Sequence, residues 1–258
     1  MSRARENWIG YETIVRREMR RVLRIWTQTL LPPVITMSLY FIIFGALIGR
    51  RIGEMGGHDY MLYIAPGLII MSVLTNAYSN VSSSFFGAKF GKHVEELLVS
   101  PLPNILILAG YVTGGVVRGL LTGALVTVVA MFFTPVSVEN WPLFIAVAVL
   151  TAVVFSLGGF INAVYAKSFD DISIVPTFVL TPLTYLGGVF YTVDMLPGFW
   201  RELSMTNPIL YMVNAFRYAM LGVSDVGIGV AFAMIFAFLA ALFAGALWLL
   251  ERGHGLRT

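Results

Sequence analysis

Residues 87–93, with the sequence Gly-Ala-Lys-Phe-Gly-Lys-His, come nearest to a nucleotide-binding motif in this chain. A phosphate-binding loop needs a preceding strand and a Lys followed by Ser or Thr, because the lysine contacts phosphate and the hydroxyl binds magnesium. Here the glycine spacing is one residue short, His93 stands where Ser or Thr belongs, and no strand precedes the segment. The sequence therefore predicts no ATP or magnesium cofactor in this chain.

Other residue types with catalytic or metal-binding chemistry are sparse. The chain has no cysteine, and His58, His93 and His254 lie far apart in polar segments. No zinc-binding spacing and no nucleophile with a nearby base occurs inside an apolar segment, which disfavours a membrane-embedded enzyme. All 14 acidic residues are expected in terminal or connecting segments, so proton coupling lacks a carboxylate in the membrane. Sodium coupling through backbone carbonyls stays open.

The composition indicates a membrane protein. Of 258 residues, 58% are hydrophobic and 12% are charged, whereas an ordinary soluble domain has roughly 25% charged residues. Apolar runs of about 20 residues form helices that cross roughly 30 Å of hydrocarbon and satisfy their own backbone hydrogen bonds. The sequence predicts a single all-α membrane domain with six spans, at about 28–49, 62–86, 105–134, 143–165, 174–193 and 227–250.

Basic residues are unevenly divided between the segments that connect these spans. Seven arginines precede the first span, and in all twelve basic residues fall on the side of the termini, against four on the opposite side. Because cytoplasmic segments are enriched in Lys and Arg, both termini are expected in the cytoplasm. Topology and anionic lipid explain the net charge of +3, so no nucleic-acid partner is expected.

Two polar segments on the expected inner side have helical patterns. Residues 7–27 place apolar side chains at three- and four-residue spacing beside a row of arginines, which predicts an amphipathic interface helix, either an anchor or a docking element. The polar segment 86–104 predicts a short helix at Lys92–Val99 that ends before Pro101 and Pro103, because proline lacks an N–H donor. A solvated loop is the alternative for that segment.

The third predicted span contains a stripe of glycines. Gly115, Gly119 and Gly123 recur every four residues and would let another helix backbone approach closely, either within the subunit or in a second copy. Arg118 lies among these glycines. A charge at this depth needs the membrane interface, a water-filled cavity or an acidic partner.

The last third of the chain contains a broken span and a short apolar helix. Pro176, Pro182 and two glycines interrupt the fifth span and favour a kinked helix around 181–191. Residues 195–222 are too polar for a span, yet they predict a helix at Pro208–Leu221, with Asn207 and Gly222 as caps, and a shorter one at Pro197–Ser204. About 14 residues make roughly 21 Å of helix, too short to cross, so we expect re-entrant helices on the outer side.

Four segments resemble a known family. They are RIWTQTLLPPVITMSLYFIIFG at 24–45, SSSFFGAKFGKHVEELLVSPLP at 82–103, FDDISIVPTFVLTPLTYLGGVFY at 169–191 and NPILYMVNAFRYAMLG at 207–222. On these segments the chain is similar to the membrane subunits of ABC type-2 transporters over nearly its whole length. The second and third segments are the specific ones, because isolated apolar spans are common to many membrane proteins.

The resemblance implies the fold of an ABC type-2 exporter transmembrane domain in a bacterial inner membrane, with an interface helix, a cytoplasmic coupling helix and outer re-entrant helices. It also implies a homodimer that joins two copies of an ABC ATPase subunit, which would hold ATP and magnesium. Contact with that subunit would lie in residues 89–100 and in the inner loop after the fourth span. The residues implied there are Lys92, His93, Val94, Glu95, Glu96, Leu97, Leu98, Asp170 and Asp171.

For a transport pathway, the resemblance nominates the second and fifth spans. The candidate residues are Asn76, Asn80, Ser83, Tyr185, Phe190 and Tyr191. The alternative for the polar ones is hydrogen bonding to a neighbouring helix. The leading hypothesis is a permease subunit that moves an amphipathic or lipid-like substrate outward, with the direction taken from the resemblance alone. A stand-alone secondary carrier or channel is the alternative.

Overall fold

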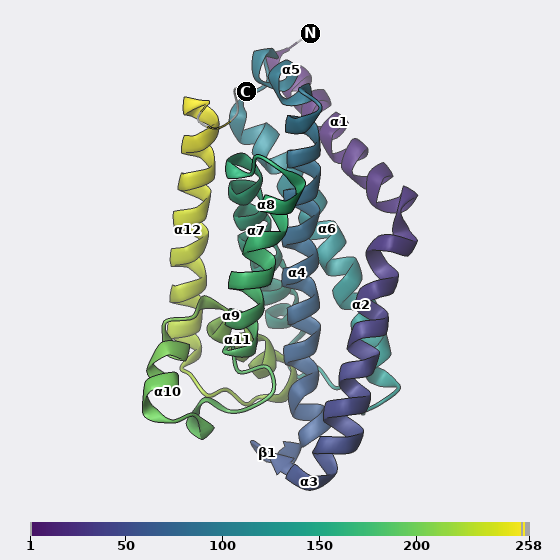
Figure 1. The fold of residues 1–258 in the computed structure, drawn as a ribbon, viewed down its shortest axis with the longest axis vertical. Helices are drawn as coiled ribbons and strands as arrows, with labels where there is room; N and C mark the ends of the chain where they lie inside the picture. The colour runs from purple at the N-terminus through teal and green to yellow at the C-terminus, as the bar shows by residue number, and fades with distance from the viewer. Residues whose placement is uncertain (1, 254, 256–258) are drawn as a thin grey trace.

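A computed structural model describes residues 2–253 and 255, so His254 and Arg257 lie outside the described residues. In this part of the chain the fold is a helical bundle with one small hairpin, formed by β1 (Glu54–Met55) and β2 (His58–Asp59). Helix α5 (His93–Val99) and the hairpin lie at opposite ends of the bundle (Figure 1). We call these the α5 end and the hairpin end. Helix α1 begins at the α5 end, where the last helix also finishes.

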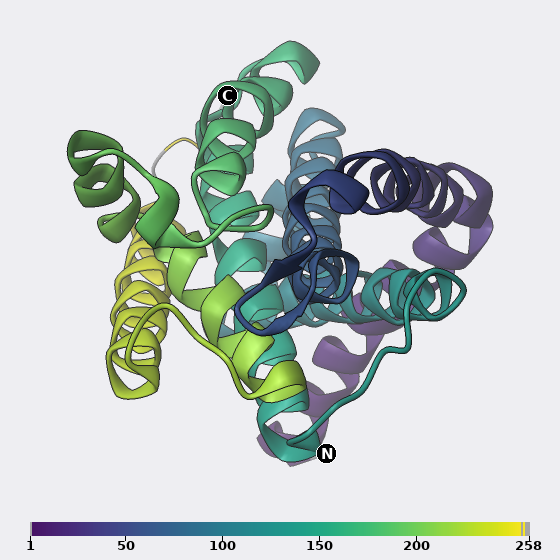
Figure 2. The same cartoon turned by 90° about the horizontal axis from the view of Figure 1, so that it is seen from below.

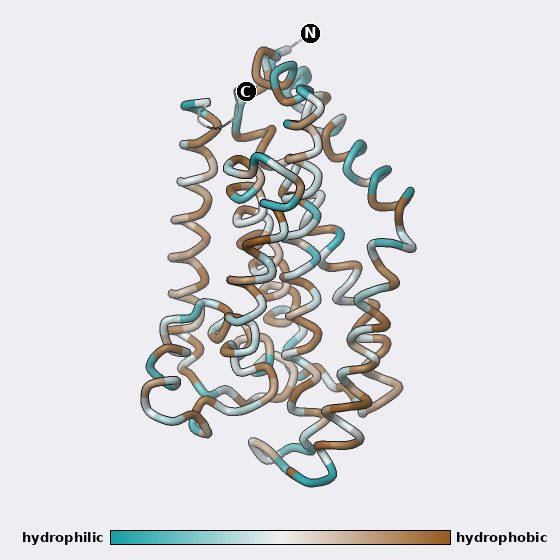
Figure 3. The backbone as a smooth tube through the Cα atoms, viewed as in Figure 1, coloured by the Kyte–Doolittle hydropathy of each residue, from teal (hydrophilic) through white to brown (hydrophobic). Residues whose placement is uncertain are grey.

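Five helical stretches in the described residues are long and apolar enough to cross a membrane. The first runs from Trp26 to Ile52 and joins three helical segments. Hydrophobic residues predominate along these stretches, and hydrophilic residues gather at the two ends and along α1 (Figure 3). The stretches correspond to five of the six predicted spans, and they are α2 (Trp26–Tyr40) with η1 (Phe41–Gly49) and α3 (Arg50–Ile52), α4 (Tyr60–Phe90), α6 (Asn104–Met131), α7 (Trp141–Tyr165) and α12 (Ile228–Arg252).

The span predicted at 174–193 differs from the helix that forms there. The chain is helical over residues 169–185, as α8 (Phe169–Val175), the π-helical η2 (Pro176–Leu180) and α9 (Thr181–Tyr185). Pro176 and Pro182 supply no backbone N–H, and Thr181 Oγ1 donates to the Pro176 carbonyl at 2.9 Å, which fits the wider π-helical turn. The predicted continuation to residue 191 is wrong, because the chain turns after Tyr185 and Gly188 adopts a φ of +69°.

The segment after this turn contains η3 (Val193–Met195), α10 (Gly198–Met205) and α11 (Pro208–Leu221). The predicted bounds and caps of α11 are confirmed: Asn207 Oδ1 accepts from the Ile209 N–H at 3.0 Å, and Gly222 has a φ of +70°. Helix α11 is buried along most of its length and packs against α4, α7 and α12.

Helix α4 lies at the centre of the bundle, packed between α6 and α7. Helices α2 and α12 lie on opposite sides of it when the bundle is viewed from the hairpin end (Figure 2). The glycine stripe of α6 faces α4, and a Cβ atom at Gly119 would lie 2.9 Å from the carbonyl oxygen of Val73. The close approach of backbones therefore occurs within this chain, where α6 meets α4.

Helix α1 (Arg3–Arg24) packs against α6 instead of lying free beside the bundle. Its buried residues are Ile14, Glu18 and Val22, and Cβ atoms at Gly110 and Gly114 of α6 would contact the first two. The predicted division of α1 into an apolar face and a charged face is therefore incomplete. The buried face includes a carboxylate that the apolar pattern does not identify.

Candidate functional site

A stripe of small polar residues follows one face of α4. Thr75, Ser79 and Ser83 recur every four residues; Thr75 and Ser83 are exposed, and Ser79 is half-buried. The nearby Ser72 and Ser82 are only 1% exposed, so the open positions belong to one face of a helix that is otherwise buried. We call these three residues the polar stripe. The Thr75 and Ser83 hydroxyls donate to the Met71 and Ser79 carbonyls of the same helix at 2.8 and 2.7 Å, and their oxygens keep acceptor capacity that water can use and hydrocarbon cannot.

Helix α2 presents a matching face to α4. Gln28, Pro32 and Thr36 are exposed and also recur at four-residue intervals. Together with parts of α4 and α6 they surround a cavity of about 310 Å³, which we call the Arg118 cavity. Its lining residues are Gln28, Thr29, Pro32, Pro33, Thr36, Met37, Tyr40, Met71, Ser72, Thr75, Asn76 and Arg118.

Arg118 is the only charged residue that lines this cavity in the described part of the chain. Its Nη2 donates to Asn76 Oδ1 at 3.3 Å, and Asn76 is oriented by its own bond from Nδ2 to the Ser72 carbonyl at 3.0 Å. The Arg118 Nε is buried without a hydrogen-bond partner among the described residues. The guanidinium is therefore held at one edge and incompletely bonded.

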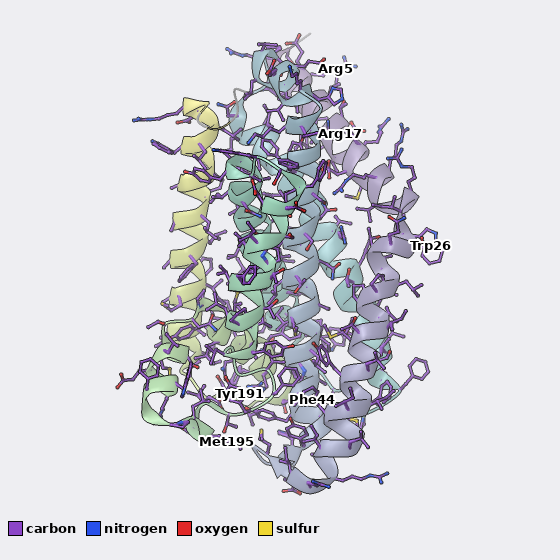
Figure 4. All side chains as sticks on the ribbon, in the orientation of Figure 1. Arg5, Arg17, Trp26, Phe44, Tyr191 and Met195 are labelled. Atoms are coloured by element: carbon purple, nitrogen blue, oxygen red, sulfur yellow. The ribbon has the colours of Figure 1, made fainter. Side chains whose placement is uncertain are left out.

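Aromatic side chains close the space between α2 and α9 towards the hairpin end. The hydroxyl oxygens of Tyr40 and Tyr185 lie 3.2 Å apart, and the Phe190 ring stacks on Phe44 with centroids 4.4 Å apart. Figure 4 shows Phe44 and Tyr191 in the same region of the bundle. Tyr185 and Phe190 were expected from the sequence, whereas Tyr40 and Phe44 were missed. Their helix gave no signal, because it is uniformly apolar around them.

A second cavity, of about 790 Å³, lies between α1 and α4 near the α5 end. We call it the inner cavity. Five arginines and one acidic residue, Glu18, line it, together with Thr13, Ser83, Ser84, Gly87, Ala88 and His93; the arginines are Arg16, Arg17, Arg20, Arg21 and Arg24. Figure 4 labels Arg17 on α1 near this end of the molecule. The surplus of guanidinium groups makes the cavity positively charged.

Glu18 and Arg21 fix α1 to α4 at this cavity. Glu18 Oε1 accepts from Ser84 Oγ at 2.6 Å, and its other oxygen lies 3.3 Å from Arg21 Nη2. Arg21 also donates to Asn80 Oδ1 at 2.7 Å and to Ser83 Oγ at 3.3 Å. The sequence places Glu18 in a terminal segment, and only the packing of α1 reveals that it is buried.

The α5 end carries a surface built from two segments distant in the sequence. Lys89 Nζ donates to the carbonyls of Val164 and Ala166 at 2.6 and 2.9 Å, and the rings of Phe90 and Phe169 lie 5.2 Å apart. Lys89 and Phe90 are the last residues of α4, so these contacts hold the end of α4 that leads into α5 against the end of α7 and the start of α8. We call the exposed residues there the α5 surface: Phe90, Lys92, His93, Glu95, Glu96, Val99, Phe169 and Asp170.

The expected contact residues of α5 differ in exposure. Glu95 and Glu96 are exposed, Leu97 and Leu98 are half-buried, and Val94 is 2% exposed, so Val94 fastens the helix to the bundle. The missed residues are apolar: Phe90, Val99 and Phe169 are 65%, 86% and 61% exposed. Large apolar residues exposed beside charged ones are typical of a protein contact surface.

Asp171 lies at this end, before the apolar part of the fifth helical segment. Its carboxylate accepts from the backbone N–H groups of Lys167 and Ser168 at 2.8 and 3.0 Å, and the Ser168 hydroxyl accepts from the Asp171 N–H. The Lys167 N–H, with the Ser168 side chain and backbone, holds the pKa of the Asp171 carboxyl below its ordinary value. Asp171 therefore caps α8, whereas the neighbouring Asp170 is exposed without this bonding role.

Comparison with known proteins identifies the family. The sequence model of the family described as "ABC-2 type transporter" matches residues 10–221. The chain belongs to this family. It is 57% identical over 251 residues to the inner membrane transport permease YadH of Escherichia coli strain K12, covering 97% of this chain and 98% of that protein. It is 26% identical over 217 residues to nodulation protein J of Rhizobium leguminosarum bv. trifolii, covering 84% and 82%. It is therefore an ABC-2 transport permease of the inner membrane, with several membrane-crossing helices.

Within this permease, the six residues nominated for a pathway occupy different environments. Ser83 and Tyr185 are exposed, and Phe190 and Tyr191 are half-buried. Asn76 and Asn80 are 5% and 0% exposed and accept hydrogen bonds from Arg118 and Arg21. Thr75 and Ser79, which the sequence reading omitted, lie on the open face instead. Their four-residue spacing with Ser83 is the signal that could have identified them.

Proposed function

We propose that this ABC-2 permease forms one half of a transport pathway, with the polar stripe of α4 and the facing residues of α2 along its wall. The observation that carries the proposal is the open polar face on a helix that is otherwise buried. In a single copy α1 and α2 cover this face only in part, and Thr75 and Ser83 remain exposed. A second copy placed against it would enclose the polar surfaces of both subunits and keep them away from lipid.

The aromatic group around Tyr185 and Phe190 supports a gated pathway. It lies where the space between α2 and α9 narrows towards the hairpin end, and α9 is joined to the bundle by short, proline-interrupted segments. Interrupted helices bend more readily than continuous ones, because proline removes backbone hydrogen bonds. The apolar, proline-interrupted part of the fifth helical segment, η2 and α9, would be the element that moves when the pathway opens, and the re-entrant α10 and α11 would frame its outer end.

The α5 surface is proposed to bind a separate ABC ATPase subunit, with two copies in the assembled transporter. Its exposed phenylalanines and carboxylates supply the apolar contact and the charged rim of a specific interface. Helix α5 packs against α4, and Lys89 and Phe90 at the end of α4 contact the end of α7 and the start of α8. A push on α5 would therefore be transmitted through the end of α4 to the fifth helical segment. ATP and magnesium would be bound by the partner subunit.

The substrate is proposed to be amphipathic or lipid-like and to move outward, with both termini of the permease in the cytoplasm. The α5 end then faces the cytoplasm, in agreement with its concentration of arginines. The inner cavity would be open to the cytoplasmic leaflet, and the aromatic group would lie towards the outer leaflet. A carrier that operates without an ATPase is the alternative, and the first experiment separates the two.

That experiment is an affinity purification of the tagged permease from its native membrane. Wild type is compared with Glu95→Arg plus Glu96→Arg and with a control, Glu54→Arg plus Glu202→Arg, which makes the same charge change at the hairpin end. An ATPase subunit should purify with wild type and the control and be lost from the α5 variant. No ATPase with any of the three would support the carrier, and equal recovery in all three would remove α5 from the interface.

The pathway wall can be tested with single cysteines, since the chain has none of its own. Thr75→Cys and Ser83→Cys should react with a water-soluble thiol reagent in membranes, because a thiol ionises only where water reaches it. Ser82→Cys is the matched control on a buried face of α4 and should stay unlabelled. Equal protection of all three positions would mean that lipid or protein, not water, covers the polar stripe.

A further inference from the structure

We infer that the Arg118 cavity binds the anionic headgroup of an amphiphile, with a phosphate or carboxylate against the Arg118 guanidinium. The inference rests on the proposed pathway and names the class of molecule that would use it. It starts from an arginine near the middle of α6, which is 28 residues long. A charge at that depth in a membrane is costly and is commonly found where it contacts an ion or substrate.

The protein does not neutralise this charge. None of the residues that line the cavity carries a carboxylate, and the ion pairs of the described chain do not include Arg118. Its partner Asn76 is a neutral amide, and the Nε atom makes no hydrogen bond within the described residues. An anion in the cavity would supply both the missing charge and the missing acceptor.

The side chain does not reach towards a membrane surface either. The Asn76 bond connects it to the middle of α4, one turn beyond the Asn80 that receives Arg21. Asn76 is itself fixed by its bond to the Ser72 carbonyl. These bonds hold the guanidinium beside the cavity, at the middle of the bundle. Its position therefore serves the cavity and does not bring the charge to bulk water.

The cavity has the size and lining for a headgroup with part of its chain. About 310 Å³ lies at the small end of the range for ligand sites, roughly 300–1,000 Å³. Gln28, Thr36 and Thr75 offer neutral donors and acceptors around the charge, and prolines and methionines supply apolar wall for an acyl chain. A cavity with one central cation, neutral polar groups and apolar walls matches an anionic amphiphile better than a sugar or a cation.

The inner cavity provides a route to this site. Arg24 lines the inner cavity, and Gln28 of the Arg118 cavity follows one turn later on the other side of the α1–α2 junction. On α4, Ser83 lines the first cavity and Thr75 the second, with Ser79 between them. An anionic headgroup attracted by the arginines of the inner cavity would thus meet polar side chains at each turn on the way to Arg118.

The test is equilibrium binding to the purified full chain in nanodiscs of zwitterionic lipid. The probes are dioctanoyl phosphatidylglycerol, dioctanoyl phosphatidylcholine and inorganic phosphate. Wild type should bind the anionic lipid at least tenfold more tightly than the zwitterionic one with the same chains. Arg118→Met should abolish that preference, Arg118→Lys should keep part of it, and the control Arg50→Met, at the hairpin end, should leave it unchanged.

Thr75→Trp gives a second, independent variant, because it fills the cavity and leaves the Arg118 charge in place. It should weaken binding of the anionic lipid even where Arg118→Met is poorly folded. A preference that survives both Arg118→Met and Thr75→Trp would overturn the proposal. Inorganic phosphate binding as tightly as the lipid would overturn an amphiphile as the ligand. Because this assay needs no ATPase, its failure alongside a positive purification result would refute the ligand and leave the permease function standing.

Discussion

Replacement of Gly159 by alanine should destabilise the contact between α4 and α7, whereas the same change at Gly158 should not. An added Cβ at Gly159 would overlap the Tyr78 carbonyl oxygen and would lie 3.1 Å from the Tyr78 carbonyl carbon and 3.3 Å from the Ser82 nitrogen. These are backbone atoms in the middle of the central helix and cannot move aside singly. At Gly158 the added Cβ would meet only ring carbons of Tyr78, at 3.7 Å, which is ordinary contact.

The magnitudes follow from two opposing effects. Alanine in place of glycine stabilises a helix by about 0.5–1 kcal/mol, and overpacking a tight site costs about 1–3 kcal/mol. Against a rigid backbone the larger cost applies, so Gly159→Ala should lose about 2 kcal/mol net and Gly158→Ala should gain about 0.5–1 kcal/mol. For a chain of this size the melting temperature should fall by about 4–8 °C in the first variant and rise by about 1–4 °C in the second.

The assay is thermal unfolding of the two purified variants in detergent. The measured quantity is the fraction of protein that remains monodisperse on size-exclusion chromatography after heating. Both variants add one methyl group at adjacent positions of α7, so helix propensity and expression effects are shared and the difference reports packing alone. Equal melting temperatures would refute the reasoning, because they would mean that α4 and α7 are not in backbone contact at Tyr78.

Three further changes test contacts described above. Arg217 is fully buried, lies 4.0 Å over the Tyr63 ring and faces Asp225. Arg217→Met should therefore lower the free energy of unfolding by about 3–5 kcal/mol, measured by thermal unfolding. The control Arg201→Met, at an exposed position, should lower it by less than about 1 kcal/mol. Glu18→Gln removes the buried carboxylate charge between α1 and α4 and should weaken the packing of α1 by about 1–3 kcal/mol. Faster proteolysis of α1 than in the wild type would show this loss. Lys89→Met should speed hydrogen exchange at residues 164–168 by roughly tenfold, since a charged hydrogen bond is worth about 1.5–3 kcal/mol; unchanged exchange would contradict the Lys89 contacts.

Local signals in the sequence were sufficient for most helix positions. Five predicted spans have matching helices, and α11 has its predicted bounds, because an apolar run and a capping residue act through neighbours in the chain. The short helix before Pro101 also forms, as α5. The fifth span was misplaced because its length depends on where Gly187 and Gly188 turn, and that turn is set by packing against α11, where a Cβ at either glycine would contact a residue of α11.

The residues of the candidate site could not be predicted in full, because they depend on which way each side chain faces. The hydropathy of a membrane helix does not give that direction. Lipid and protein interior are both apolar, so a membrane helix shows little difference between its buried and open faces. Asn76 and Ser83 look alike in the sequence, yet one is buried against Arg118 and the other lies on the open face. The polar stripe becomes visible only when α6 and α7 cover the remaining faces of α4.

The sequence by itself determined the class of protein, the approximate position of five membrane-crossing helices, the uneven distribution of basic residues and the absence of an ATP motif. Each of these depends on composition or on residues close together in the chain. Only the tertiary structure decided that Glu18 is buried, that α6 uses its glycines against α4, that Phe90 meets Phe169, and that Arg118 faces a cavity without a carboxylate. These features join segments far apart in the sequence, and their energies arise only when helices pack and each face gains or loses its partners.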